Sequence, residues 1–137
     1  MIKKTFLTVM LLAGLATSLF AAEPTLEKLT QGGVDFLRNS QADDGSWTAP
    51  NRPGVSGLIT TSLLASGLSA DDPTVAKALK HLESFIQKDG GIYNPEGNHR
   101  NYETCIILMA FEKANGDGRY ESLRLKTQKS FAWSAMG

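Results

Sequence analysis

Helical segments of two kinds alternate along this chain of 137 residues, and that alternation most constrains its fold. Segments 25–39 and 72–86 are amphipathic, because apolar residues recur there every three or four positions with charged residues between them. Segment 57–68 carries no charge, and segment 102–114 carries none between Cys105 and Phe111. A helix without a polar face is buried. The order therefore predicts an all-α fold of two stacked helical hairpins, of α/α-toroid or solenoid type, instead of a plain four-helix bundle.

Particular residues follow from this interpretation. We expect more than half of residues 25–115 to be helical. Asp72 and Pro73 predict a helix start, as an N-cap acid followed by proline at the first helical position. In the uncharged segments we expect burial of Leu63, Leu64, Leu108 and Met109. In the first segment one apolar stripe is predicted, made of Leu26, Leu29, Gly33, Phe36 and Leu37.

The turns after the two amphipathic segments repeat one another. Segment 41–47 reads Gln-Ala-Asp-Asp-Gly-Ser-Trp, and segment 87–93, at an offset of 46, reads Gln-Lys-Asp-Gly-Gly-Ile-Tyr. Segments 61–64 and 104–107 match in the same way at an offset of 43. A period in the forties is typical of helical-hairpin repeats.

The first of these stretches, residues 33–47, resembles the QW motif of squalene and hopene cyclases, in the terpenoid cyclase and protein prenyltransferase toroid family. Gly32 stands where that motif usually has a basic residue. The second copy is weaker, with tyrosine in place of tryptophan. The resemblance covers roughly residues 25–118, and the residues that carry it are Gly33, Phe36, Leu37, Gln41, Gly45, Trp47, Gln87, Gly91 and Tyr93.

The resemblance implies structural roles for the motif. Gln41 would hydrogen-bond backbone groups at a helix end, Gly45 would allow the turn, and Trp47 would pack over the adjoining hairpin. The complete ring of that family holds more hairpins than the two found here. After Gly118 another outer helix begins, but from Arg124 onward no clean apolar stripe is present. We therefore expect residues 23–118 to form the helical repeats and residues 119–137 an irregular or aberrant tail.

The N-terminal residues have the pattern of a secretory signal peptide. Lys3 and Lys4 precede an apolar run from residue 6 to 20, and Ala21-Ala22 offers a cleavage site. An uncleaved anchor or a buried core helix is the alternative, although the run is shorter than the roughly 20 residues of a membrane span. Loss of residues 1–22 leaves 12 of the 14 basic residues against 14 acidic ones, a net charge of −2. That charge predicts no nucleic-acid partner. We expect an exported protein, periplasmic or secreted, with no membrane span after cleavage.

No catalytic site emerges from the sequence. The Asp-x-Asp-Asp string with which cyclases of the resembling family protonate an alkene is missing. Asp43-Asp44 lies in a turn and Asp71-Asp72 at a helix start. Glu103-Thr104-Cys105 is superficially similar to the prenyltransferase zinc ligands, but both histidines precede Cys105. We predict no metal or other cofactor. Cys105 is expected to be a buried thiol, with an intermolecular disulfide or metal ligation as alternatives.

Three functions fit these observations. The first is an exported, non-catalytic repeat module that binds an apolar ligand, such as an isoprenoid, or a protein partner. The second is a fragment of a squalene cyclase-like or prenyltransferase-like enzyme acting on isoprenoids. The third is a secreted helical domain with no ligand. The side chains expected to face a cavity are Tyr102, Glu103 and Cys105, and self-association is expected because two hairpins leave an open apolar edge.

Overall fold

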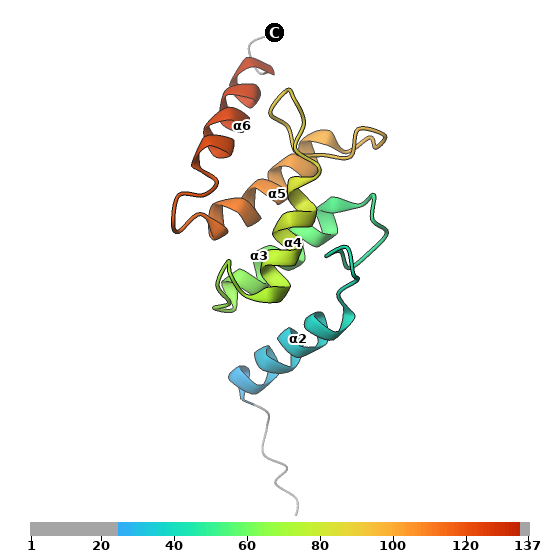
Figure 1. The fold of residues 1–137 in the computed structure, drawn as a ribbon, viewed down its shortest axis with the longest axis vertical. Helices are drawn as coiled ribbons and strands as arrows, with labels where there is room; N and C mark the ends of the chain where they lie inside the picture. The colour runs from blue at the N-terminus through green and yellow to red at the C-terminus, as the bar shows by residue number, and fades with distance from the viewer. Residues whose placement is uncertain (1–24, 135–137) are drawn as a thin grey trace, which may run out of the picture.

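The computed structural model describes residues 25–134 and confirms an all-α fold (Figure 1). Within that range there are five helices and no strands; Ile86 and Ile92 form an isolated bridge. None of these helices is both long and apolar enough to span a bilayer. The predicted signal peptide lies outside the described residues. The helices are α2 (Leu26–Ser40), α3 (Pro53–Ala65), α4 (Pro73–Glu83), α5 (Arg100–Ala114) and α6 (Glu121–Ser134).

The helix starts reflect local sequence. The Thr25 hydroxyl accepts a hydrogen bond from the Lys28 backbone at 3.3 Å and caps α2. The Asp72 carboxylate accepts one from the Thr74 backbone at 3.0 Å and caps α4, as predicted. By contrast, α3 and α5 begin without a side-chain cap. The position at which α3 and α5 begin is therefore set by the preceding loops and not by a capping side chain.

The core lies where the uncharged helices α3 and α5 pack against each other and α4 packs against both (Figure 1). Their backbones come close at Gly57, where an added Cβ would lie 3.1 Å from Cγ1 of Ile107. A larger residue at this position would push the two helices apart. The buried apolar residues are Val34, Leu63, Val75, Leu79, Leu82, Ile92, Ile107, Ala110, Phe111, Ala114 and Tyr120.

Burial of the uncharged helices is less complete than predicted. Leu63 is buried, while Leu64 and Leu108 are half-buried against the core. The prediction for Met109 is wrong, because its side chain is 54% exposed. Each of these helices has protein on only part of its circumference, so the opposite strip, which includes Leu58, faces outward. An uncharged helix surface is therefore not a buried one here.

The stripe predicted on α2 also faces outward for most of its length. Val34 is buried and Leu37 packs against the core, but Leu26, Leu29 and Phe36 are 81%, 58% and 70% exposed. Figure 1 shows α2 extending away from the other helices. Only its C-terminal half packs on the body of the protein.

The turns that follow α2 and α4 have the same hydrogen bonds. In the first, the Ala42 N–H donates to Ser46 O at 2.9 Å and the Gly45 N–H donates to Ala42 O at 3.0 Å. In the second, Gln87 donates to the Gly91 carbonyl at 2.8 Å and Gly90 donates back to Gln87 at 3.1 Å. The equivalent residues are thus 45 apart, not the 46 predicted from the sequence.

This shift of one residue changes which side chains correspond. Gly45, with φ of 91°, matches Gly90, with φ of 89°, and not Gly91. Trp47 matches Ile92, because the backbone N–H of each donates to a hydroxyl of the following inner helix. Tyr93 therefore does not take the place of the tryptophan.

Each turn also lies against a later helix, the first turn against α4 and the second against α6. An added Cβ on Gly45 would be 2.4 Å from the Lys77 carbonyl oxygen of α4, and one on Gly90 would be 3.2 Å from that of Lys126 in α6. The Thr127 hydroxyl of α6 also donates to the Gly90 carbonyl at 2.8 Å. Consequently α6 lies beside the second turn as α4 lies beside the first.

The expected irregularity of the tail is wrong for residues 121–134, which form α6. This segment contains neither glycine nor proline and is rich in good helix formers. Glu121 and Arg124 form an ion pair at 2.6 Å across one turn. Residues 121–134 are therefore helical without the apolar stripe that the prediction required.

The glycine turns yield a graded prediction. Gly45→Ala should lower the free energy of unfolding by about 3–4 kcal/mol, since it adds both positive-φ strain and overlap with a carbonyl. Gly67→Ala should cost only about 1–2 kcal/mol, because Gly67 has φ of 97° but open space around it. Gly90→Ala should fall between them. Urea unfolding of the three variants checks the order, and equal losses at Gly45 and Gly67 would contradict the contact with α4.

Candidate functional site

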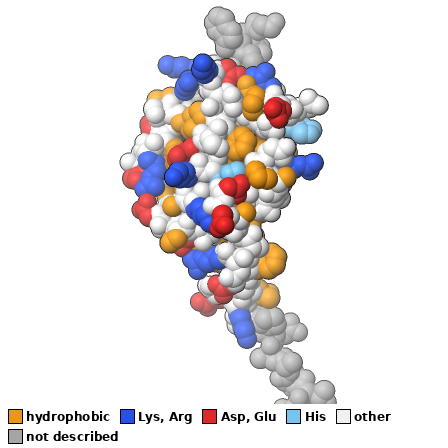
Figure 2. All heavy atoms as spheres, turned by 45° about the vertical axis from the view of Figure 1, so that its right-hand side comes forward, with side chains coloured by type: hydrophobic (Ala, Val, Ile, Leu, Met, Phe, Trp, Pro, Cys, Tyr) orange, Lys and Arg blue, Asp and Glu red, His pale blue; other side chains and the backbone are white. Residues whose placement is uncertain are grey.

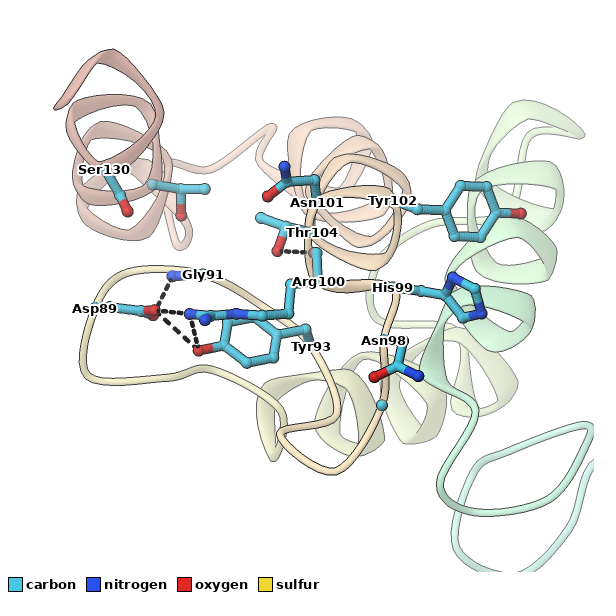
Figure 3. Close-up of a pocket in the computed structure, with 12 residues that line it drawn as sticks. Asp89, Gly91, Tyr93, Asn98, His99, Arg100, Asn101, Tyr102, Thr104 and Ser130 are labelled. Atoms are coloured by element: carbon cyan, nitrogen blue, oxygen red, sulfur yellow. Dashed lines mark hydrogen bonds and ion pairs between the residues drawn. The ribbon is translucent and has the colours of Figure 1, made fainter. Parts of the chain in front are cut away.

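Two hollows lie at the N-terminal end of α5. The larger, of about 680 Å³, lies between the second turn, the start of α5 and α6 (Figure 3). The smaller, of about 380 Å³, lies between the starts of α3 and α5. Tyr102, 63% exposed, borders both, as do His99 and Asn98. The side chains that line the larger hollow include Asp89, Tyr93, Asn98, His99, Arg100, Asn101, Tyr102, Thr104, Thr127 and Ser130.

The charges in the larger hollow are paired with one another (Figure 3). Arg100 donates to the Asp89 carboxylate and to the Tyr93 hydroxyl, both at 2.5 Å, and its guanidinium carbon lies 4.3 Å from the centre of the tyrosine ring. The Tyr93 hydroxyl donates to Asp89 at 2.9 Å. The three side chains therefore form one closed group.

This closed group shifts the titration of two of its members. The Gly91 backbone N–H, the Tyr93 hydroxyl and Arg100 all stabilise the charged carboxylate, so the pKa of Asp89 lies below its usual value. Burial, together with the hydrogen bond to Asp89, raises the pKa of Tyr93. Asp89 is therefore charged and Tyr93 neutral near neutral pH, and neither is poised to exchange a proton there.

The smaller hollow contains a second carboxylate that is hydrogen-bonded within the fold. Glu103 is buried, and its carboxylate accepts a hydrogen bond from the Asn94 backbone at 2.8 Å. Asn94 also donates from its side chain to the Asn51 carbonyl at 3.0 Å. Glu103 thus holds the loop before α5 in place, beside the start of α3.

Other side chains around the two hollows are also engaged in contacts within the fold. The Thr104 hydroxyl donates to the Arg100 carbonyl and accepts from the Ile92 N–H, while that of Thr127 donates to Gly90, so both are occupied within the fold. The ring of His99 lies edge-on to Tyr102. Within residues 25–134, no group of three or more His, Cys, Asp or Glu side chains could hold a metal ion.

The first QW-like copy links neighbouring elements. The Gln41 side chain donates to the Gly45 carbonyl at 3.1 Å and to the Thr74 carbonyl at 2.9 Å. Thr74 lies at the N-terminal end of α4. The Trp47 indole donates to the Leu37 carbonyl at 2.7 Å, near the end of α2, and packs against the core. These contacts tie α2, the first turn and α4 together.

The second copy is built differently. Gln87 donates to the carbonyls of Phe85 and Tyr93 and so stays within its own turn. The link to the next helix is made instead by the Thr127 hydroxyl, which reaches Gly90 from α6. Gly91 takes the place of Ser46 in the turn, and Tyr93 contributes to the larger hollow.

Of the three residues predicted to face a cavity, two line a hollow and one does not. Tyr102 and Glu103 line the hollows, but Cys105 lines neither of them, and its thiol is exposed, which contradicts the predicted burial. Thr104 and Ile107 are the neighbours that face the core, and a residue one position on from Thr104 is turned about 100° around the helix. In α2, Gly33 and Phe36 are exposed and Leu37 is half-buried.

Sequence interpretation missed the residues that shape the larger hollow. The sequence indicates Asp89 only as part of the repeated turn and does not indicate Arg100, because it predicts a start of α5 at Tyr102 whereas the helix begins at Arg100. The sequence signal for this site is the Asp-Gly-Gly turn. An aspartate in such a turn accepts a hydrogen bond from a backbone N–H of the same turn, as Asp89 does from Gly91, and this fixes the direction of its carboxylate.

The exposed face of α2 is the second candidate site. We define it by Leu26, Leu29, Gly33 and Phe36, and it is continuous with the core through Leu37. Figure 2 shows hydrophobic side chains on the narrow extension that α2 forms below the body of the protein. Nothing lies within 4 Å of a Cβ added at Gly33. The face is therefore apolar and open.

Comparison with protein families, curated proteins and solved structures finds no match to this chain. The resemblance to the toroid family thus depends on the motif residues alone.

The closed group around Asp89 predicts a pH dependence. Because folding lowers its pKa, Asp89 contributes stability above its unfolded pKa, and that contribution is lost as the pH falls through the folded pKa. The wild type should be more stable than Asp89→Asn near neutral pH, and the difference should shrink between about pH 5 and about pH 3. Urea unfolding across this range measures it. Glu96→Gln, which changes an exposed carboxyl in the same loop, serves as control and should show a smaller difference.

Proposed function

We propose that this chain is an exported, non-catalytic helical-hairpin module of the toroid type that binds a protein partner through the exposed face of α2. The observation that carries the proposal is the run of three large apolar side chains, Leu26, Leu29 and Phe36, left open on one helix. Scattered single apolar residues are ordinary on protein surfaces, whereas a contiguous apolar face marks an interaction site.

The repeated turn supports the hairpin-repeat part of the proposal. An amphipathic helix, a glycine turn and an uncharged helix occur twice in order, and the two turns lie against α4 and α6 respectively. In this interpretation α6 is the outer helix of a third unit. Repeats of this kind contact only their neighbours, and within residues 25–134 nothing covers the apolar side of α2 around Leu26 and Leu29.

Binding is better supported than catalysis. The carboxylates of the two hollows are held by hydrogen bonds within the fold, as Asp89 and Glu103 show. An apolar or isoprenoid ligand needs a pocket with a mainly apolar lining, and the larger hollow is lined mostly by polar side chains. A protein partner needs only an open face.

The face can be tested with a hydrophobic dye such as anilinonaphthalene sulfonate. The folded wild type should bind it, and Leu29→Ser with Phe36→Ser should remove most of the binding while the helical circular dichroism is retained, because both side chains are already exposed. Leu125→Ser, at an exposed leucine of α6, is the matched control and should leave the signal nearly unchanged. Equal losses for the two changes would contradict a localised site on α2.

Export can be tested separately. The basic start and apolar run predict that a bacterial host delivers the chain outside the cytoplasm with residues 1–22 removed. Intact-mass measurement on the recovered protein should place the new N-terminus at Ala22 or Glu23. Replacing Leu11 and Leu12 by arginine should retain the full-length chain in the cytoplasm. A wild-type chain that keeps Met1 would contradict the signal peptide.

A further inference from the structure

We propose that the two hollows at the start of α5 bind a neutral oligosaccharide, with the Tyr102 ring as the surface on which one of its sugar rings stacks. This site is separate from the exposed face of α2 and does not depend on the function proposed for that face. Three features of the hollows support it: the setting of Tyr102, the hydrogen-bonding groups around it, and the balance of charge.

The first feature is an aromatic ring that is exposed and yet held in place. Tyr102 lies close to α3 at Gly54, where an added Cβ would be 3.5 Å from its Cε1 atom. On another side the His99 ring lies edge-on to it, with 6.4 Å between the ring centres. A tyrosine held in this way offers a large contact area at a low cost in conformational entropy. Because Tyr102 borders both hollows, a ligand that lies across its ring can extend into each of them.

The second feature is a set of hydrogen-bonding groups that the fold does not use. Within residues 25–134, the side-chain amides of Asn98 and Asn101 make no hydrogen bond. Arg100 bonds Asp89 and Tyr93 through Nη2 alone, so its Nε and Nη1 groups remain as donors in the larger hollow (Figure 3). An amide both donates and accepts hydrogen bonds, as a sugar hydroxyl does. The lining therefore matches a ligand that has many hydroxyl groups.

The third feature is the balance of charge. In the larger hollow, Asp89 and Arg100 form an ion pair at 2.5 Å and compensate each other. The lining of the smaller hollow adds Arg52, Glu96 and Glu103, and the Glu103 carboxylate is hydrogen-bonded within the fold. Positive side chains are therefore not in excess in either lining, as they would be in a site for phosphate or carboxylate ligands. An uncharged ligand leaves the ion pair and the Glu103 hydrogen bond intact.

A pyranose ring meets these requirements together. Its C–H groups form an apolar face that can pack on an aromatic ring, while the hydroxyls at its rim donate and accept hydrogen bonds. The hollows, of about 680 and 380 Å³, are within the range of about 300–1,000 Å³ that is usual for small-molecule sites. Since one hollow lies on each side of Tyr102, the site suits a short chain of sugar units better than a single sugar.

Isothermal titration calorimetry of the full chain with cellohexaose, xylohexaose, mannohexaose and laminarihexaose tests the site. At least one of these should bind, and the corresponding disaccharide should bind more weakly because it cannot reach both hollows. Tyr102→Ala should weaken binding by about tenfold or more, whereas Tyr102→Phe, which keeps the ring, should retain most of it. Asn101→Ala should cost about three- to tenfold through the loss of a hydrogen bond. Phe36→Ala, at an exposed ring of α2, is the matched control and should leave the affinity unchanged.

Helical circular dichroism should be the same in all variants, because Tyr102, Asn101 and Phe36 are exposed. A wild type that binds none of the four hexasaccharides at about 1 mM overturns the proposal. Equal affinity of the wild type and Tyr102→Ala overturns it too, since the ring would then not contact the sugar. If hexagalacturonate binds in place of the neutral sugars, with an affinity that falls steeply as salt is added, the ligand is an anion and the proposal is wrong. None of these results alters dye binding at α2, so the two proposals fail separately.

Discussion

The close packing of α3 on α5 is the interaction on which the other helices depend. At Gly57 the two helices approach so closely that an added Cβ would lie 3.3 Å from the Ile107 Cα, and this contact fixes the surface on which α4 lies. The turns follow from it, because Trp47 and Ile92 are each held by a hydroxyl of the helix that follows their turn. With both turns fixed, their glycines present a flat backbone to α4 and α6.

Hydrophobic patterning predicted the helices because the periodicity records which residues pack. Val75, Leu79 and Leu82 repeat at helical spacing and are buried, and Asp72 caps the helix that they form. The patterning did not predict how much of each helix is covered. Met109 and Cys105 lie in an uncharged run, yet they face outward because no other element within residues 25–134 covers that side. The absence of charged residues shows that a helix surface can be buried at little cost. Whether it is buried depends on how many other elements pack around that helix.

The candidate hollows were harder to foresee for a related reason. Sequence alignment pairs Tyr93 with Trp47 because both are aromatic, whereas the backbone pairs Ile92 with Trp47. A difference of one residue moves Tyr93 from the position of a packing residue to the wall of a polar hollow, beside Arg100. The register of a turn depends on which residue adopts positive φ, and with two adjacent glycines the sequence does not determine it.

The helices at the two ends of the described structure differ in how much of their surface is covered, and this explains why the exposed apolar face lies on α2. At the C-terminal end, α6 covers the second turn and is joined to it through Thr127. At the N-terminal end, α2 carries an apolar stripe that continues past its contact with the body at Leu37. If α2 is the outer helix of a stacked unit, as proposed above, its apolar side has the composition expected of a surface between units. Such a surface is either covered by another chain or left in contact with water.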